Sequence, residues 1–290
     1  MRDNIRAEAI ALHDRFTHDG MDRRVFMARM VALAGSLAAA EALIGAIAAS
    51  PAAAAIVPAD DKRIRAEKRI LAITNGPNFH AYVASPAKGS RHPIVMVIHE
   101  NRGLNDHIRD VARRFAVAGF AAVAPDFLSS AGGTPADEDV AREAIGKLDL
   151  GKSVSDAVLL LRALANDSPG GKVGAVGFCW GGAYVNRLAV AAGSKLAAGV
   201  VYYGPGPDPS EAPTVSAPLM IHHAGLDDRV AQTLWPWITA LRAAGKPVTY
   251  FNYEGANHAF NNDTSAERYN KAAADLAWKR TLRFFRRHLA

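Results

Sequence analysis

The stretch that constrains the fold most is Lys172–Gly182, with the sequence KVGAVGFCWGG. A short apolar run bounded by glycines and followed by helix-compatible residues 183–192 predicts a buried strand, a tight turn and a helix. Gly177 and Gly181 flank the turn, where the chain leaves no room for side chains. Cys179 therefore takes the nucleophile position of a Gly-x-nucleophile-x-Gly turn, where the helix N-terminus favours a thiolate and an oxyanion. The alternative is an inert buried cysteine in a glycine-rich chain.

The composition fits one α/β domain better than two. Half of the 290 residues are hydrophobic, which is enough for a sizeable core. Because the chain has a single cysteine, it can form neither an intramolecular disulfide nor a metal site of several cysteines.

The net charge of +6 comes from residues 56–290, which we call the body, because the six arginines of residues 1–55 are balanced by six acidic residues. Many of the basic residues surround an apolar stripe in the last helical stretch. The stripe consists of Trp278, Leu282, Phe285 and Leu289 and is expected to face the core. We interpret the basic residues as a solvated helix face rather than a nucleic-acid site.

The N-terminal residues differ from the rest. Residues 1–20 are polar with no sustained period, and Arg23-Arg24 precede an apolar run at 31–49 and a small-residue tract at 52–55. This order resembles a twin-arginine export signal, although Glu41 interrupts the apolar run. We therefore divide the chain into an N-terminal segment, 1–55, and an α/β domain, 56–290, and expect export to the periplasm. The alternatives are a membrane anchor and an ordinary N-terminal helix packed on a cytoplasmic domain.

From Lys62 onward, predicted strands and helices alternate. The strands are expected at 69–74, 80–85, 94–99, 120–124, 173–178, 198–203, 219–223 and 248–253. The helices are expected at 106–117, 137–148, 153–164, 183–192, 232–243 and 266–288. Such alternation predicts a mostly parallel central sheet with helices on both faces, and an active site at the carboxyl ends of the strands.

Three residues at predicted strand ends have the chemistry of a catalytic triad. Cys179, Asp227 and His258 follow three different strands, in the order nucleophile, acid, histidine that is typical of α/β hydrolases. His258 would act as the base and Asp227 would orient its imidazole. Asp228 competes with Asp227 for the acid's role, or caps the helix that follows.

An oxyanion hole requires two backbone NH groups. The candidates are the NH of Trp180, directly after the nucleophile, and the NH of Asn101, in the loop after an earlier strand. Glu100 in the same loop could hold the thiol protonated at rest. Its alternative is an ion pair with Arg102 or Arg109.

Two neighbouring pairs of side chains have a weaker claim to function. His222 and His223 are expected to point to opposite faces of one strand, so we predict no metal site there. Tyr202 and Tyr203 are expected to be split in the same way. Tyr203 is a candidate for binding the substrate or tuning the nucleophile, and the alternative is a core tyrosine.

The sequence from about Lys68 to Leu289 resembles the dienelactone hydrolase family of α/β hydrolases. The resemblance rests on five motifs: His99–Gly103, Ala124–Phe127, Gly177–Gly182, Gly225–Asp228 and Gly255–Phe260. It implies the triad on Cys179, Asp227 and His258, which favours Asp227 over Asp228, and it places the family's oxyanion-loop glutamate on Glu100. An arginine of members that cleave dienelactone falls on Asn262, and a second substrate arginine aligns loosely with Arg142.

The resemblance and the triad together predict a hydrolase that cleaves a carboxylic ester or lactone. The expected partner is a small-molecule substrate, with no cofactor, no nucleic acid and no membrane in the mature form. The alternative is a non-catalytic exported ligand-binding protein that retains the hydrolase fold. The natural substrate and the oligomeric state remain open.

Overall fold

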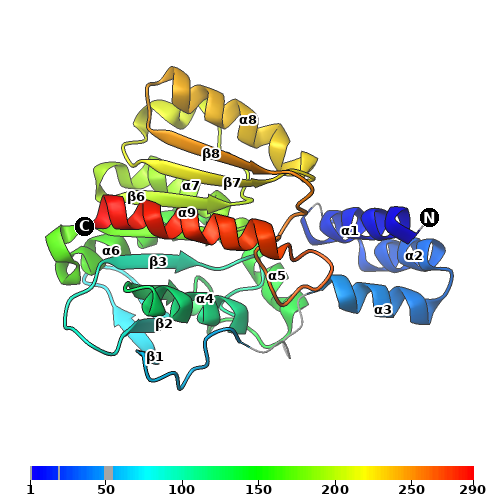
Figure 1. Ribbon diagram of the computed structural model, residues 1–290, viewed down its shortest axis with the longest axis horizontal. Helices are drawn as coiled ribbons and strands as arrows, with labels where there is room; N and C mark the ends of the chain where they lie inside the picture. Colours follow the sequence, from blue (N-terminus) through cyan, green and yellow to red (C-terminus); the bar gives the residue numbers. More distant parts are fainter. Residues whose placement is uncertain (1, 19, 49–54) are drawn as a thin grey trace.

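The computed structural model describes residues 2–18, 20–48 and 55–290, and these form one eight-stranded sheet with helices around it (Figure 1). The strands are β1 (Ile64–Ala72), β2 (Asn78–Pro86), β3 (Ile94–Ile98), β4 (Ala121–Pro125), β5 (Val173–Phe178), β6 (Ala198–Tyr202), β7 (Leu219–Ala224) and β8 (Val248–Tyr253). The helices are α1 (Arg2–His18), α2 (Arg23–Ala34), α3 (Leu37–Ile47), α4 (Asp106–Val117), α5 (Glu138–Gly146), α6 (Leu150–Asp167), α7 (Trp180–Ala192), α8 (Asp228–Ala243) and α9 (Lys271–Leu289).

The strand order is β1-β2-β4-β3-β5-β6-β7-β8. Six strands, β3 to β8, pair in parallel, and β2 pairs antiparallel with both β1 and β4. Every residue of β3 is buried, as expected for a central strand covered on both faces. The prediction of a mostly parallel α/β sheet is confirmed.

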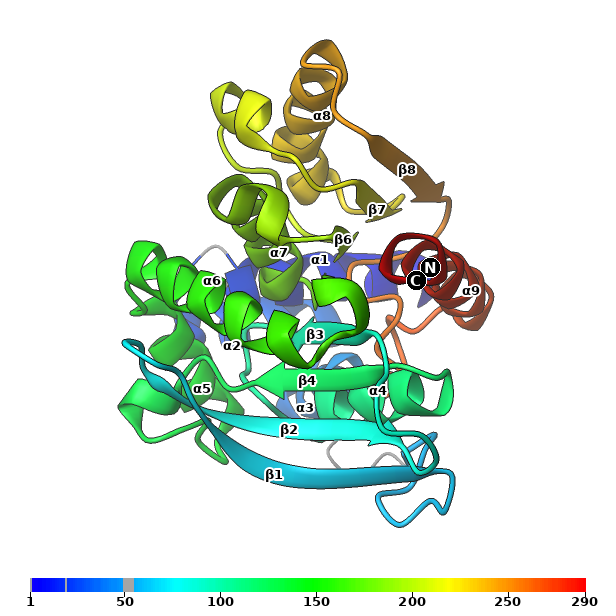
Figure 2. The same cartoon turned by 90° about the vertical axis from the view of Figure 1, so that its left-hand side faces the viewer.

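Helices cover both faces of the sheet (Figure 2). Helices α4 and α9 lie on one face, where Phe115, Phe120 and Phe285 form part of the core. Helices α6, α7 and α8 lie on the other, with Leu160 and Trp237 in a second core cluster. Because the strands from β3 to β8 are parallel, their carboxyl ends lie together at one end of the sheet, which is where a site is expected in such folds.

The largest differences from the predicted element boundaries, five residues each, are at the starts of β1 and α9. Strand β1 begins at Ile64 rather than residue 69, because charged side chains alternate along this sheet edge and conceal the strand pattern. Helix α9 begins at Lys271 rather than residue 266, where Asn270 caps it by accepting a hydrogen bond from the Ala273 NH at 3.1 Å. The residues before Asn270 form the turns that hold His258.

The apolar stripe of α9 faces the core as predicted. Phe285 and Leu289 are fully buried, and Trp278 and Leu282 pack against the same cluster while partly exposed. On the other side of the helix, Lys279, Arg283, Arg286 and Arg287 are exposed, whereas Arg280 is half-buried over the ring of Phe251.

Helices α1 to α3, which we call the N-terminal unit, have their own apolar cluster. Residues 1–20 show no sustained period in the sequence, yet Arg2–His18 form helix α1. Leu12 and Phe16 of α1 are buried against the other two helices, and the rings of Phe16 and Phe26 stack at 4.3 Å. Of the predicted small-residue tract, residues 52–54 lie outside the described part of the chain.

The membrane-spanning potential of the described helices is limited to one bent pair. No single described helix combines the length and the apolarity needed to cross a membrane. Helices α2 and α3 meet the criteria only when taken together, with a bend of 106° between them.

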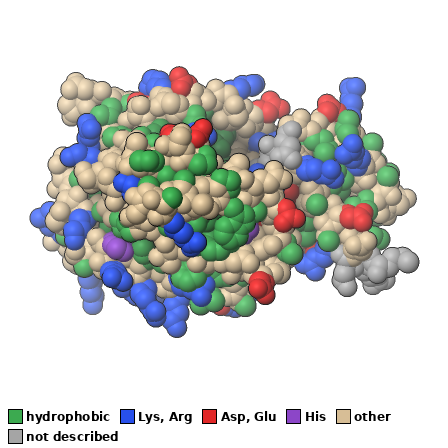
Figure 3. Space-filling view, turned by 90° about the horizontal axis from the view of Figure 1, so that it is seen from above, with side chains coloured by type: hydrophobic (Ala, Val, Ile, Leu, Met, Phe, Trp, Pro, Cys, Tyr) green, Lys and Arg blue, Asp and Glu red, His purple; other side chains and the backbone are tan. Residues whose placement is uncertain are grey.

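The N-terminal unit lies beyond the carboxyl ends of the parallel strands (Figure 1). Seen from above, it projects as a lobe from the end of the body and carries both basic and hydrophobic side chains (Figure 3).

Candidate active site

The turn around Cys179 is shaped by backbone crowding. A Cβ atom on Gly177 would lie 2.0 Å from the carbonyl oxygen of Gly181, and a Cβ on Gly181 would lie 2.4 Å from the carbonyl oxygen of Ile98. Cys179 itself has a φ of 56° and a ψ of −113°, a conformation that L-residues rarely adopt. The predicted tight strand-turn-helix is present, with Cys179 between β5 and α7.

This crowding also sets the two segments that carry the predicted oxyanion donors against each other. Trp180 is the first residue of α7, and the close approach of Gly181 to Ile98 and His99 sets the loop after β3 against the turn. The NH groups of Trp180 and Asn101 therefore belong to two segments that meet beside the thiol.

His258 and Asp227 are joined directly. Nδ1 of His258 lies 2.5 Å from Oδ2 of Asp227, and both side chains are buried. The other oxygen of Asp227 accepts a hydrogen bond from the Val230 NH at 3.1 Å, so this carboxylate also caps α8. Asp228, the alternative acid and alternative cap, is exposed in the first turn of α8 and does neither.

The charges at the site determine the pKa of His258. Burial, the largest influence, lowers it, but the charges of Asp227 and Cys179 and the hydrogen bonds to both raise the pKa to about 10. Burial raises the pKa of Asp227, and the charge and hydrogen bond of His258 outweigh it, so the net shift is downward. Since Asp227 occupies Nδ1, the hydrogen bond with Cys179 belongs to the Nε2 side of the imidazole.

His99 braces the loop after β3, a role that the sequence did not reveal. Its Nε2 accepts a hydrogen bond from the Phe127 NH at 3.2 Å, so Nδ1 carries the proton and donates to the Glu100 carbonyl at 2.7 Å. The ring also stacks on Trp180 at 5.3 Å. Burial lowers the pKa of His99, which keeps the imidazole neutral in this arrangement.

Glu100 forms no ion pair with Arg102 or Arg109, the two partners considered in the sequence analysis. Arg102 pairs with Glu138 and Arg109 pairs with Asp106. Instead, Oε2 of Glu100 accepts a hydrogen bond from Nδ2 of Asn262 at 3.1 Å.

A second contact of Glu100 is with Tyr203, which directly follows strand β6. Oε1 of Glu100 lies 3.5 Å from the Tyr203 hydroxyl. The amide of Asn262 is itself fixed, because its oxygen accepts hydrogen bonds from the NH and hydroxyl of Thr264 at 3.1 and 2.6 Å. Both contacts join segments far apart in the sequence, and no local motif indicates them.

The two tyrosines are not split between the faces of the sheet. Strand β6 ends at Tyr202, and Tyr203 has a φ of 39°, so the alternation of a strand stops there. Their rings lie 6.0 Å apart in one core cluster. Tyr203 consequently reaches Glu100 and lies 5.1 Å from the ring of His258.

Arg142, the second candidate for a substrate arginine, is engaged by the N-terminal unit. Its Nη1 donates to the Phe16 carbonyl at 2.9 Å, and its guanidinium lies 4.4 Å from the centre of the Phe16 ring. The side-chain amide of Asn101 donates to the Thr17 carbonyl at 3.3 Å. Both contacts therefore lead to α1 rather than to Cys179.

His222 and His223 point to opposite faces of β7, as predicted. Nδ1 of His222 lies 2.9 Å from the Tyr253 hydroxyl, whereas His223 contacts Trp235 and Tyr250. In residues 2–18, 20–48 and 55–290, no cluster of three His, Cys, Asp or Glu side chains is arranged to hold a metal ion.

Comparison with known proteins gives one consistent result. A model of the dienelactone hydrolase family matches residues 79–289. A protein of Escherichia coli (strain K12) named "Putative carboxymethylenebutenolidase" is 31% identical over 260 residues, which cover 83% of this chain and 94% of that protein. A protein of the same name from Saccharolobus solfataricus is 31% identical over 264 residues, covering 76% of this chain and 98% of that protein.

Solved structures agree with this assignment. A crystal structure of a "Putative Dienelactone Hydrolase" from Klebsiella pneumoniae superposes with a TM-score of 0.69 at 28% identity, over 77% of this chain and 98% of that one. The dienelactone hydrolase of Anabaena variabilis, at 20% identity and a TM-score of 0.60, shares the fold. With its sheet, its motifs and these relatives considered together, this chain belongs to the dienelactone hydrolase family of α/β hydrolases.

Proposed function

We propose that this hydrolase cleaves a carboxylic ester or lactone of a small molecule, with Cys179 as nucleophile, His258 as acid and base, and Asp227 as the residue that orients His258. The observation that carries the proposal is the 2.5 Å contact between Asp227 and Nδ1 of His258, with Cys179 as the next hydrogen-bond partner of the same imidazole.

The first half of the reaction forms a thioester. The raised pKa of His258 favours an imidazolium next to Cys179, and the sulfur attacks in its thiolate form, which is the nucleophilic one. The thiolate of Cys179 attacks the acyl carbon, and the carbonyl oxygen becomes an oxyanion held by the NH groups of Trp180 and Asn101. When the C–O bond breaks, His258 gives its proton to the departing alkoxide, which in a lactone stays attached to the acyl group.

The second half releases the acid. His258, now neutral, takes a proton from water as the water oxygen attacks the thioester carbon. The C–S bond breaks, the carboxylic acid leaves, and the proton on His258 restores the ion pair with the thiolate. The reaction needs no added oxidant, reductant or cofactor.

The test is the turnover of p-nitrophenyl acetate and of an enol lactone by the wild type and by Cys179→Ala. We expect kcat/KM to fall by at least about 10³-fold in the variant, because the nucleophile is lost. Equal rates, with circular dichroism showing that both proteins are folded, would reject the proposal.

We also propose that the protein is exported. Support comes from the paired Arg23 and Arg24, which are exposed at the start of α2, and from the apolar residues that follow them. Fractionation of cells producing the full chain should recover it in the periplasm. The conservative double variant Arg23→Lys with Arg24→Lys should remain in the cytoplasm, while Arg29→Lys should be exported normally. Equal distribution of all three proteins would contradict export through the paired arginines.

A further inference from the structure

Helix α1 spans the two loops that carry the candidate active site. Near its C-terminal end, the Thr17 carbonyl accepts a hydrogen bond from Asn101 and the Phe16 carbonyl accepts one from Arg142. Asn101 directly follows Glu100 in the loop after β3. This end of α1 therefore lies on the oxyanion side of the site.

The rest of α1 reaches the histidine side. Arg6 forms an ion pair with Glu267 and donates to its carbonyl at 3.1 Å, and Nη1 of Arg268 lies 3.4 Å from Oδ1 of Asp14. These body residues belong to the segment between β8 and α9 that also contains His258. One helix thus connects the segment of Glu100 with the segment of His258, across the carboxyl edge of the sheet (Figure 1).

Helix α3 adds contacts to the same segment. The Ser265 hydroxyl donates to the Ile47 carbonyl at 2.5 Å, and the Glu267 NH donates to the Ala46 carbonyl at 3.2 Å. Both ends of the N-terminal unit are therefore fastened beside the histidine loop.

The reacting groups are covered in this state. Cys179 is 5% exposed, His258 3% and Glu100 8%. A cavity of about 640 Å³ lies nearby, lined by Arg102, His107, Arg109, Asp110, Glu138 and Asp263 among others, and neither Cys179 nor His258 is part of its wall. A second cavity of about 350 Å³ beside Trp278 does not reach them either. Neither of these two cavities gives a substrate access to the thiol.

The N-terminal unit has an apolar interior of its own and contacts the body through polar groups. Its apolar cluster is internal and contains no residue of the two body clusters, whereas the contacts that fasten α1 are hydrogen bonds and ion pairs. Partly exposed ion pairs contribute only about 0–1 kcal/mol each, because water replaces them readily. The apolar interior keeps the three helices together when those contacts open.

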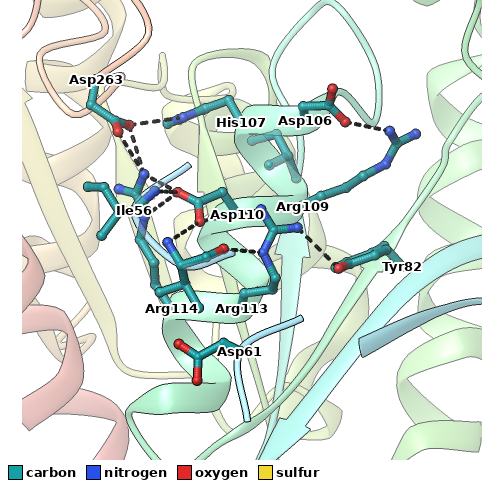
Figure 4. A network of polar contacts seen from close by, with 12 residues as sticks. Ile56, Asp61, Tyr82, Asp106, His107, Arg109, Asp110, Arg113, Arg114 and Asp263 are labelled. Atoms are coloured by element: carbon teal, nitrogen blue, oxygen red, sulfur yellow. Dashed lines mark hydrogen bonds and ion pairs between the residues drawn. The ribbon is translucent and has the colours of Figure 1, made fainter. Parts of the chain in front are cut away.

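A tether holds the chain where the N-terminal unit joins the body (Figure 4). The two carboxylate oxygens of Asp110 accept hydrogen bonds from the NH groups of Ile56 and Val57 at 3.2 and 2.8 Å, and Nε of Arg113 donates to the Val57 carbonyl at 2.5 Å. Asp110 and Arg113 are buried on α4, so this anchor is more strongly held than the surface of α1.

We propose that, in the full-length chain with residues 1–55 attached, α1–α3 form a tethered cap over Cys179, and that this cap must undock before a bulky ester reaches the thiol. The proposal that the cap covers the thiol does not depend on which reaction the protein catalyses. Only the consequence for substrate size rests on the proposed function.

The single cysteine makes the cap testable without turnover, because any thiol reagent reports on Cys179 alone. The variant Arg6→Glu with Asp14→Arg places like charges against Glu267 and Arg268 and leaves the net charge unchanged. The matched control is Glu8→Arg with Arg15→Glu, which exchanges the same kinds of charge on exposed positions of the same helix.

The measurement is the rate at which a bulky maleimide and the small reagent iodoacetamide modify the full-length protein. If labelling passes through the undocked state, its rate follows the population of that state. We expect the Arg6/Asp14 variant to react with the maleimide about tenfold faster than the wild type, with a smaller increase for iodoacetamide and no change in the control. Adding Glu267→Arg to the variant should slow labelling again, which a merely misfolded protein would not do.

Turnover of a long-chain and a short-chain p-nitrophenyl ester completes the test. The variant should gain on the long-chain ester relative to p-nitrophenyl acetate, and the control should not. Equal labelling rates in all proteins would overturn the cap. Faster labelling with no turnover of either ester would retain the cap and reject the proposed function.

Discussion

Two buried histidines near the same edge of the sheet have opposite acid-base properties. His222 on β7 is fully buried between neutral groups, with its ring nitrogens 2.9 Å from the Tyr253 hydroxyl and 3.0 Å from the Thr281 hydroxyl. Burial and then the charge of Arg280 lower its pKa to about 3. His258 is almost as buried, yet its pKa is raised to about 10 by Asp227 and Cys179 against the effect of burial.

The difference shows that burial alone does not make a histidine functional. Both rings have lost water, but only His258 is flanked by groups that are negative when ionised. His222 consequently remains a neutral hydrogen-bonding residue of the core, while His258 can hold and release a proton next to a thiol. The following experiments test this contrast, beginning with the largest expected effect.

Replacing Asp227 by Asn should make His258 resemble His222. The amide supplies no charge and can hold the wrong tautomer of the imidazole, so we expect kcat/KM for p-nitrophenyl acetate to fall by about 10³- to 10⁴-fold. NMR titration should show a lower pKa for His258 in the variant. Asp228→Asn is the matched control and should retain activity, because Asp228 is exposed. An equal loss in both variants would mean that the contact with Asp227 has no special role.

Replacing His222 by Ala should lower the free energy of unfolding and leave the rate of catalysis nearly unchanged. The change leaves a cavity and removes partners from the buried Thr281 and Tyr253 hydroxyls, so the free energy of unfolding should fall by about 3 kcal/mol. Urea denaturation measures this, with His80→Ala at an exposed position as the control. Activity of the folded variant should change less than about threefold. A large loss of activity at full stability would place His222 in the reaction and end the comparison.

The two histidines should also give stability opposite dependences on pH. Because the pKa of His222 falls from 6.5 to about 3 on folding, the unfolded chain binds the extra proton between these values, so stability is lost as pH falls through that range. His258 contributes stability that is complete below pH 6.5 and is lost as pH rises through about 10.

Urea midpoints measured from roughly pH 4 to pH 6 isolate the first effect. The variant His222→Gln keeps a polar side chain but cannot titrate, so the slope of unfolding free energy against pH should decrease by up to about 1.4 kcal/mol per pH unit. His80→Gln should leave the slope unchanged. An unchanged slope in His222→Gln would show that His222 is not held neutral.

The smallest effects are expected for the two tyrosines. Tyr202 belongs to the network of His222, because its hydroxyl lies 2.8 Å from that of Thr281, so Tyr202→Phe should cost about 1 kcal/mol of stability and leave kinetics unchanged. Tyr203 contacts Glu100 at 3.5 Å, so Tyr203→Phe should alter kcat/KM by only about two- to fivefold. The reverse pattern in denaturation and steady-state assays would contradict the assignment of each tyrosine to its histidine.

The alternation of strands and helices, and the strand-end positions of the candidate triad residues, could be predicted because they follow local rules. Apolar runs marked the buried strands, and parallel strands with a common open edge bring their carboxyl ends together. Cys179 was further restricted by the glycines on both sides of it. The acid next to His258 needed the family resemblance, since Asp227 and Asp228 are equivalent in a local pattern.

The structural features that could not be predicted depend on contacts between segments that are far apart in the sequence. The contacts of Glu100 with Tyr203 and Asn262 join residues 103 and 162 positions apart. The orientation of Tyr203 depends on a positive φ at a residue that is not a glycine, so the sequence does not indicate it. Helix α1 was missed because its apolar residues are few and are buried against α2 and α3, so its pattern has meaning only within the N-terminal unit.

The crowding around Gly177 and Gly181 has one further consequence. Since main-chain atoms alone fix where residue 179 stands, exchanging sulfur for oxygen in Cys179→Ser changes the attacking element while the scaffold stays still. The turn therefore keeps the backbone of residue 179 in the same place in both proteins, so a difference in rate reports the exchange of sulfur for oxygen, with its shorter bond to Cβ, and not a shift of the main chain.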